Sequence, residues 1–188
     1  MDKSFAAQLD QLLSAARRFD LTALQSQLDV AVDLMRSALQ VGRPVLVCGN
    51  GGSAADSQHI AGELVGKFLK ERRALNVRAL TTDTSVVTAW ANDVDYDTVF
   101  SRQVEAYGQP DGVLWAISTS GNSRNVLRAA EAARSLGMQV VAMTGEGGGK
   151  LGPLADVCFA VPSSVTPRIQ EMHVMLYHYV CERIEAGF

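Results

Sequence analysis

Residues 45–53 are Val45-Leu-Val-Cys-Gly-Asn-Gly-Gly-Ser53, an apolar run that stops at a cluster of glycines. A short, uninterrupted apolar run predicts a strand that is buried on both faces, and the glycines predict a tight turn after it. A helical pattern from Ala54 to Lys70 follows directly. These residues therefore predict one strand–loop–helix unit, which is the building block of a parallel sheet.

The same alternation continues along the chain. The further apolar runs are Val77–Leu80, Val113–Ile117, Gln139–Met143 and Val157–Val161, and the helical patterns beside them are Ser85–Trp90, Asp97–Tyr107, Ser123–Leu136 and Pro167–Ile184. Parallel strands joined by helical crossovers form a sheet that is covered on both faces. We therefore expect an α/β fold with five parallel strands, doubly wound.

The first part of the chain differs from this core. Apolar residues recur at helical spacing from Ser4 to Leu39, Asp20 is placed to begin a second helix, and Gly42-Arg43-Pro44 ends the region. We expect one domain over residues 1–188, with N-terminal helices in 1–43 and an α/β core in 44–188. The long apolar faces of the N-terminal helices predict a partner subunit that covers them.

Composition limits the classes of function. The chain has 188 residues, of which 47% are hydrophobic, and a formal net charge of −3. This charge does not favour direct binding of nucleic acid, and no apolar stretch is long enough for a membrane span or resembles a signal peptide. The three cysteines, Cys48, Cys158 and Cys181, are far apart and odd in number, which favours reduced thiols in the cytoplasm.

Two loops are candidates for a ligand site, because ligands of such sheets bind at the carboxyl ends of the strands. One loop is Gly49–Ser53. The other, Ser118-Thr-Ser-Gly-Asn-Ser123, places four hydroxyl side chains before a helix. Free N–H groups at the start of a helix and nearby hydroxyls suit a phosphate. The alternative is an ordinary turn in which Ser123 only caps the helix.

Two helices carry candidate acid–base or metal-binding residues. His59 and Glu63 are four residues apart and share one helix face. On the last helix, Glu171 lies within about 20° of His178 and Gln170 about 80° from it, so helical angle alone favours Glu171 as the neighbour of His178. His173, about 140° from His178, is predicted to point elsewhere, where it is either packed or solvated.

Several motifs occur together in one order, and together they resemble the sugar isomerase (SIS) domain family. They are Gly49–Ser53, His59 with Glu63, Thr81–Ser85, Asn92-Asp93, Ser118–Ser123, and Arg168-Ile-Gln-Glu171 with His178. The resemblance runs from about Pro44 to the C-terminus. It implies a flavodoxin-like sheet, a homotetramer with active sites between subunits, and isomerisation of sedoheptulose 7-phosphate to D-glycero-D-manno-heptose 7-phosphate.

The resemblance also implies residue roles. The substrate-binding residues would be Asn50, Gly51, Gly52, Ser53, Glu63, Asn92, Asp93, Ser118, Thr119, Ser120, Ser123 and Gln170, and the ligands of a zinc ion would be His59, Glu63, Gln170 and His178. Some family members have an aspartate just before the Arg-Ile-Gln motif. This chain has Pro167 there, so any role of that aspartate does not carry over.

Ketose–aldose isomerisation needs a base that moves a proton between C1 and C2, and an acid that serves the oxygens. We assign Glu63 as the base and His178 as the acid. The alternative is a non-catalytic relative of this fold that binds the replication initiator DnaA as a tetramer. A sugar-phosphate-sensing regulator, a third hypothesis, would need a DNA-binding module, for which the sequence shows no segment. The motifs do not assign a role to the glycine-rich loop 145–150.

Overall fold

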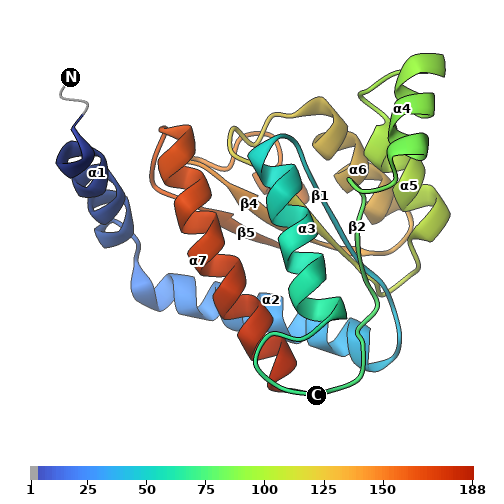
Figure 1. The fold of residues 1–188 in the computed structure, drawn as a ribbon, viewed down its shortest axis with the longest axis horizontal. Coiled ribbons are helices and arrows are strands. Elements are labelled where there is room, and N and C mark those ends of the chain that lie inside the picture. The colour runs from blue at the N-terminus through green and yellow to red at the C-terminus, as the bar shows by residue number, and fades with distance from the viewer. Residues whose placement is uncertain (1–3) are drawn as a thin grey trace.

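The computed structural model describes residues 4–188 and contains one parallel sheet flanked by helices (Figure 1). The strands are β1 (Val45–Gly49), β2 (Val77–Ala79), β3 (Val113–Ser118), β4 (Gln139–Thr144) and β5 (Val157–Ala160). Their order is β2-β1-β3-β4-β5, and every pair is parallel. The predicted fold is confirmed, and the order of the strands reverses between β1 and β3.

Helices cover both faces of this sheet. They are α1 (Phe5–Arg17), α2 (Leu21–Gln40), α3 (Gly52–Val65), α4 (Thr84–Asp93), α5 (Val99–Tyr107), α6 (Arg124–Ser135) and α7 (Thr166–Glu185), with a short 3₁₀ helix η1 (Gly152–Leu154). One apolar core joins α2, α3 and α7 to the odd-numbered residues of β1, such as Val45. A second core joins α5 and α6 to the even-numbered ones, such as Leu46. Alternate side chains of one strand thus fill two cores, which explains the uninterrupted apolar run.

The N-terminal region consists of two helices, α1 and α2, and the second begins after Asp20, as expected. Asp20 accepts hydrogen bonds from the backbone N–H groups of Thr22 and Ala23 at 3.0 and 3.1 Å, and thereby caps α2. In Figure 1, α1 lies beside α7 at one end of the molecule. Arg168 of α7 fixes it there by donating to the backbone oxygen of Gln8 at 2.7 Å.

The helix that was expected to reach Lys70 ends earlier, at Val65. The buried carboxylate of Glu185 accepts hydrogen bonds from the backbone N–H groups of Phe68, Leu69 and Lys70 at 2.6–2.9 Å. These N–H groups would face preceding carbonyls in a helix, so their capture by Glu185 selects a loop. No helix within residues 4–188 is long and apolar enough to cross a membrane.

Candidate functional site

The two predicted ligand loops lie side by side. Gly49 at the end of β1 pairs with Ile117 near the end of β3, so both loops leave the sheet at the point where strand order reverses. Gly51 adopts φ +56°, a conformation that favours glycine, and it allows the chain to turn directly into α3. Sheets of this class bind ligands in this crevice.

The hydroxyls of the Ser118–Ser123 loop form a cluster. Oγ of Ser118 lies 3.0 Å from Oγ of Ser123 and 3.5 Å from Oγ of Ser120. Ser123 occupies the N-cap of α6, but its side chain makes no capping hydrogen bond. Ser123 thus occupies the cap position, as the alternative expects, but its hydroxyl faces Ser118 and does not cap the helix. In the first turn of α6, the N–H of Val126 donates to Oδ1 of Asn125 at 3.0 Å.

The glycine-rich loop 145–150 packs against this serine loop. The N–H of Gly145 donates to the backbone oxygen of Thr119 at 2.9 Å, and the N–H of Leu151 donates to that of Gly121 at 2.9 Å. A Cβ on Gly149, where φ is +57°, would lie 2.6 Å from the backbone oxygen of Ser120. The glycines thus let one backbone lie directly on another, a role that the sequence pattern did not reveal.

A polar hollow adjoins the serine loop. Its volume is about 290 Å³, and it is lined by Thr119, Ser120, Glu146, Ser163, Ser164, Thr166 and Ile169. Five of these side chains carry hydroxyls, which suit the oxygens of a phosphorylated sugar.

Asn50 belongs to a network that includes two residues missed at the sequence level. Its amide pairs reciprocally with that of Asn125 at 2.8 and 2.9 Å, and the hydroxyl of Tyr96 donates to Oδ1 of Asn50 at 3.0 Å. Neither Tyr96 nor Asn125 lies in the glycine loop that it supports, so no local pattern marks them.

The other predicted substrate contacts differ in accessibility. Asn92 and Asp93 are exposed at the end of α4, where Nδ2 of Asn92 donates to Oδ1 of Asp93 at 2.8 Å. Ser53 is only 3% exposed, because it packs beneath Gly49. The side chain of Ser53 therefore supports the loop from below.

A second cluster lies on the facing surfaces of α3 and α7. His59, Glu63 and His178 each offer a ligand atom, and these atoms all lie within 4.8 Å of one another. Nε2 of His59 is 2.9 Å from Oε1 of Glu63. Two imidazole nitrogens and a carboxylate oxygen are ligands that zinc prefers, and ligand atoms about 2.1 Å from a tetrahedral zinc would be about 3.4 Å apart. The donor set fits the ion after small side-chain movements.

The expectation that Glu171 neighbours His178 is wrong. The carboxylate of Glu171 pairs with Arg168 at 2.6 Å. Helical angle placed the two residues on one face, but seven residues also separate them by about 10 Å along the helix. Gln170 lies about 12 Å of helical rise before His178, and its amide contacts Gly52 at the start of α3.

The His59 ring has a partner on its other side. The hydroxyl of Tyr177 lies 2.9 Å from Nδ1 of His59, and Tyr177 itself is 1% exposed. Burial raises the pKa of the Asp56 carboxyl, while the nearby His59 and the Tyr177 hydroxyl oppose this shift. Oδ2 of Asp56 is buried without a hydrogen-bond partner in the described part of the chain.

His173 points away from the cluster and packs in the interior, which decides between the packed and the solvated alternative. It is fully buried, and its Nε2 lies 3.0 Å from the backbone oxygen of Thr144. Burial lowers the pKa of His173 to about 4, and the hydrogen bond to Thr144 opposes this shift. This histidine is neutral near pH 7 and anchors α7 to β4.

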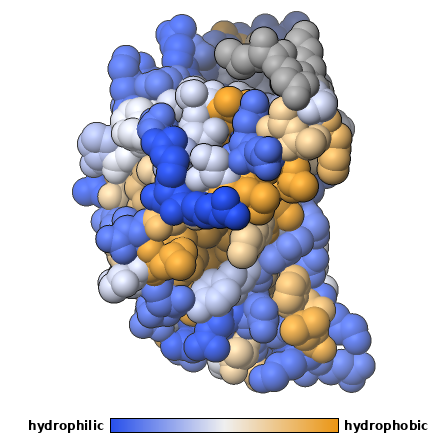
Figure 2. All heavy atoms as spheres, turned by 90° about the vertical axis from the view of Figure 1, so that its left-hand side faces the viewer, coloured by the Kyte–Doolittle hydropathy of each residue, from blue (hydrophilic) through white to orange (hydrophobic). Residues whose placement is uncertain are grey.

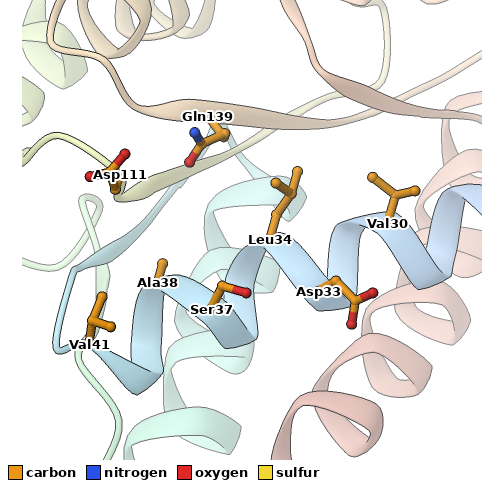
Figure 3. Close-up of a pocket in the computed structure, with 8 residues that line it drawn as sticks. All are labelled: Val30, Asp33, Leu34, Ser37, Ala38, Val41, Asp111 and Gln139. Carbon is orange, nitrogen blue, oxygen red and sulfur yellow. The ribbon is translucent and has the colours of Figure 1, made fainter.

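A separate groove lies at the opposite end of the sheet (Figure 3). Its volume is about 570 Å³, and it is lined by Val30, Asp33, Leu34, Ser37, Ala38, Val41, Asp111 and Gln139. Figure 3 shows Leu34 pointing from α2 toward the sheet, near the start of β4 at Gln139. The groove contains none of the predicted site residues.

Comparison with known proteins shows the family of the chain. The family described as SIS domain matches residues 4–145. The phosphoheptose isomerase of Akkermansia muciniphila is 48% identical over 177 residues, which cover 94% of each chain. That of Helicobacter pylori strain P12 is 50% identical over 173 residues, covering 92% of this chain and 90% of the relative.

Two solved structures extend the comparison to three dimensions. The phosphoheptose isomerase of Neisseria gonorrhoeae is 43% identical, with a TM-score of 0.89 over 96% of each chain. That of Francisella tularensis is 36% identical, with a TM-score of 0.87 over 97% of this chain and 94% of the other. Sequence and structure are thus similar over nearly the whole length.

Proposed function

The chain belongs to the SIS domain family, and on that premise we propose that it is a phosphoheptose isomerase. It interconverts sedoheptulose 7-phosphate and D-glycero-D-manno-heptose 7-phosphate, a step toward the activated heptose of the lipopolysaccharide core. The observation that carries this proposal is the identity of about half of all residues with phosphoheptose isomerases over more than 90% of the chain. The free thiols of Cys48, Cys158 and Cys181 favour a cytoplasmic location.

We assign the phosphate of the substrate to the serine loop. The Ser118, Ser120 and Ser123 hydroxyls and the start of α6 can all donate to its oxygens. Thr119 lines the adjoining hollow, which suits the hydroxyl-bearing carbon chain. The remaining contacts are assigned to Asn50, Gly51, Gly52, Ser53, Asn92, Asp93 and Gln170, with Ser53 contributing through its backbone.

The proton transfers are assigned to the second cluster. Glu63 acts as the base and His178 as the acid, since a carboxylate and an imidazole suit transfer between C1 and C2 and to the oxygens. Oε1 of Glu63 faces His59, so the second carboxylate oxygen is the one assigned to the substrate proton. His59, Glu63 and His178 of one chain would hold a zinc ion. Gln170, the fourth assigned ligand, would have to come from another subunit, because it lies about 12 Å of helical rise from His178 in the same chain and its amide contacts Gly52. When bound, zinc polarises substrate oxygens.

The arrangement of the two clusters supports sites shared between subunits. His59 is seven residues after Gly52, or about 10 Å of helical rise away from the ligand loops. The His59 side chain is 47% exposed to solvent, so a neighbouring subunit can reach it. A tetramer would bring the acid–base cluster of one subunit to the serine loop of another.

The helix α1 offers a surface for such an assembly. Phe5, Leu9 and Leu13 recur every four residues along it and are 80%, 43% and 40% exposed. Figure 2 views the end of the molecule that carries α1 and shows apolar side chains on this face. An exposed apolar stripe on a helix favours burial against another subunit.

Turnover of sedoheptulose 7-phosphate by the purified protein tests the function directly. We expect formation of the aldose phosphate and no binding to the replication initiator. An inactive protein that binds the initiator would instead establish the non-catalytic alternative.

Mixed tetramers test the shared site. Ser120→Asp places a negative charge in the phosphate site, and Glu63→Gln removes the base, so each variant alone should be inactive. Co-refolding equal amounts should restore about a quarter of the sites if each site takes the two residues from different subunits. No restored turnover, with tetramers confirmed by light scattering, would place both residues of each site in one chain.

A further inference from the structure

A buried ion pair lies between the two helices that carry the proposed base and acid. Arg72, in the loop 66–76 after α3, and Glu185, at the end of α7, are 3.3 Å apart, and their side chains are 2% and 1% exposed. The proposed mechanism uses neither residue. Burying two charges is costly unless further hydrogen bonds surround them, so the contacts of each partner show what the pair holds in place.

Arg72 binds the end of α3 that carries Glu63. Its Nη2 donates to the backbone oxygen of Glu63 at 2.9 Å, and its Nη1 donates to the backbone oxygens of Gly66 and Arg73 at 2.9 and 3.0 Å. The last four carbonyls of a helix lack partners within the helix, and α3 ends at Val65. The helix dipole also favours a cation at this end. Arg72 thus holds the backbone of the proposed base.

Glu185 fixes the surroundings of His178. It follows His178 by seven residues on α7, so the two residues lie within about 20° of one helix face and about 10 Å apart along the helix. The carboxylate of Glu185 accepts hydrogen bonds from the backbone N–H groups of Phe68, Leu69 and Lys70. The Phe68 ring lies 5.8 Å from the His178 ring, measured between their centroids. Glu185 thus holds the loop beside the proposed acid.

The two sets of contacts meet in the ion pair, because Glu185 is the partner both of Arg72 and of the Phe68 backbone. We propose that Arg72 and Glu185 are positioning residues that fix the end of α3 against α7 and so set the separation of Glu63 and His178. This inference rests on the proposed function, since it concerns the base and the acid assigned there. Both side chains are buried, so neither touches the substrate.

Glu185→Gln disturbs this arrangement with little change in shape. One carboxylate oxygen accepts from Leu69 and Lys70. The other accepts from Phe68 and faces Arg72, so the NH₂ group of an amide would meet donors on either side. We expect kcat to fall about 10–100-fold, since a displacement of about 1 Å can lower a rate about 100-fold. KM should stay within about threefold of the wild type, because the ion pair does not contact the serine loop assigned to the phosphate.

Arg72→Lys decides the question if Glu185→Gln does not fold. It keeps the positive charge, but one ammonium group cannot replace a guanidinium fork that faces four oxygens, so kcat should fall in the same way.

The matched control is Asp156→Asn. The carboxylate of Asp156 also accepts a backbone N–H, from Val140 at 2.7 Å, and pairs with an arginine, Arg134, at 3.5 Å. Arg134 belongs to α6, which covers the other face of the sheet. This variant should therefore keep the wild-type kcat.

Steady-state kinetics well below the melting temperature of each variant separate positioning from stability. An ion pair that only stabilises the fold would lower the melting temperature and leave kcat of the folded protein unchanged. A wild-type kcat in folded Glu185→Gln or Arg72→Lys would therefore overturn the inference, and so would a change in KM alone. A wild type without turnover of the sugar phosphate would instead overturn the proposed function, and this inference with it.

Discussion

The serine loop and the His59–Glu63–His178 cluster are built in opposite ways. The serine loop comes from six consecutive residues, and neighbouring backbone fixes it through Gly145, Gly149 and Leu151. The cluster combines two helices whose members are more than 100 residues apart in sequence. The first is a rigid site made by local chain geometry, and the second exists only because α3 packs against α7.

Under the proposed function, this difference matches the role assigned to each region. Phosphate is the same in substrate and product, so a fixed set of donors can hold it throughout the reaction. The proton moves between two carbons, so its carriers need a free acid or base group. The serines accordingly satisfy one another, whereas the cluster keeps partly exposed side chains, 47% for His59 and 21% for Glu63.

The largest effect is expected at the reactive cluster. Glu63→Gln keeps the shape of the side chain but cannot take up the proton, so turnover should fall about 10²–10⁴-fold. Glu105→Gln, on an exposed carboxylate that pairs with Arg102, is the matched control and should leave turnover unchanged. Steady-state kinetics measure both. Equal turnover in Glu63→Gln and the wild type would contradict the assignment of Glu63 as the base.

A smaller effect concerns the other histidine of α7. The folded pKa of His173 is about 4, below the ordinary value of 6.5, so the unfolded chain takes up the proton first as the pH falls. Its contribution to stability is present above about pH 6.5 and decreases toward pH 4, by about 3 kcal/mol in total.

This loss can be isolated with His173→Gln, which does not titrate. Urea unfolding between pH 7.5 and 4 should show a shallower fall of the unfolding free energy in the variant. Identical slopes for His173→Gln and the wild type would contradict a neutral buried His173.

The smallest effect is expected at the serine loop, because several donors share the phosphate. A hydrogen bond to a charged group contributes about 1.5–3 kcal/mol, so Ser120→Ala should weaken binding of the sugar phosphate about tenfold or more. Ser135→Ala removes a hydroxyl that bonds to Glu131 at the far end of α6 and is the control. Calorimetric titration measures the dissociation constant. An unchanged value for Ser120→Ala would contradict the assignment of the phosphate to the serine loop.

Local patterns determined much of this protein. The apolar runs predicted all five strands. The glycine and serine loops predicted a ligand site at the carboxyl ends of the strands, and the structure places these two loops next to each other. The pair His59 and Glu63 followed from their spacing of four. Each of these features depends on residues close in sequence, where the period of the chain fixes the geometry.

Contacts between distant residues were decided only by the tertiary structure. Glu185 ends α3 at Val65 by binding the backbone of the following loop, and no pattern within residues 54–70 predicts this. Helical angle favoured Glu171 beside His178, yet Glu171 pairs with Arg168 because rise along the helix separates it from His178. Tyr177 contacts His59, which is 118 positions away in sequence, because α7 packs against α3. A sequence sets which face of a helix a residue occupies, but only the packing of whole helices sets which level of the neighbouring helix it meets.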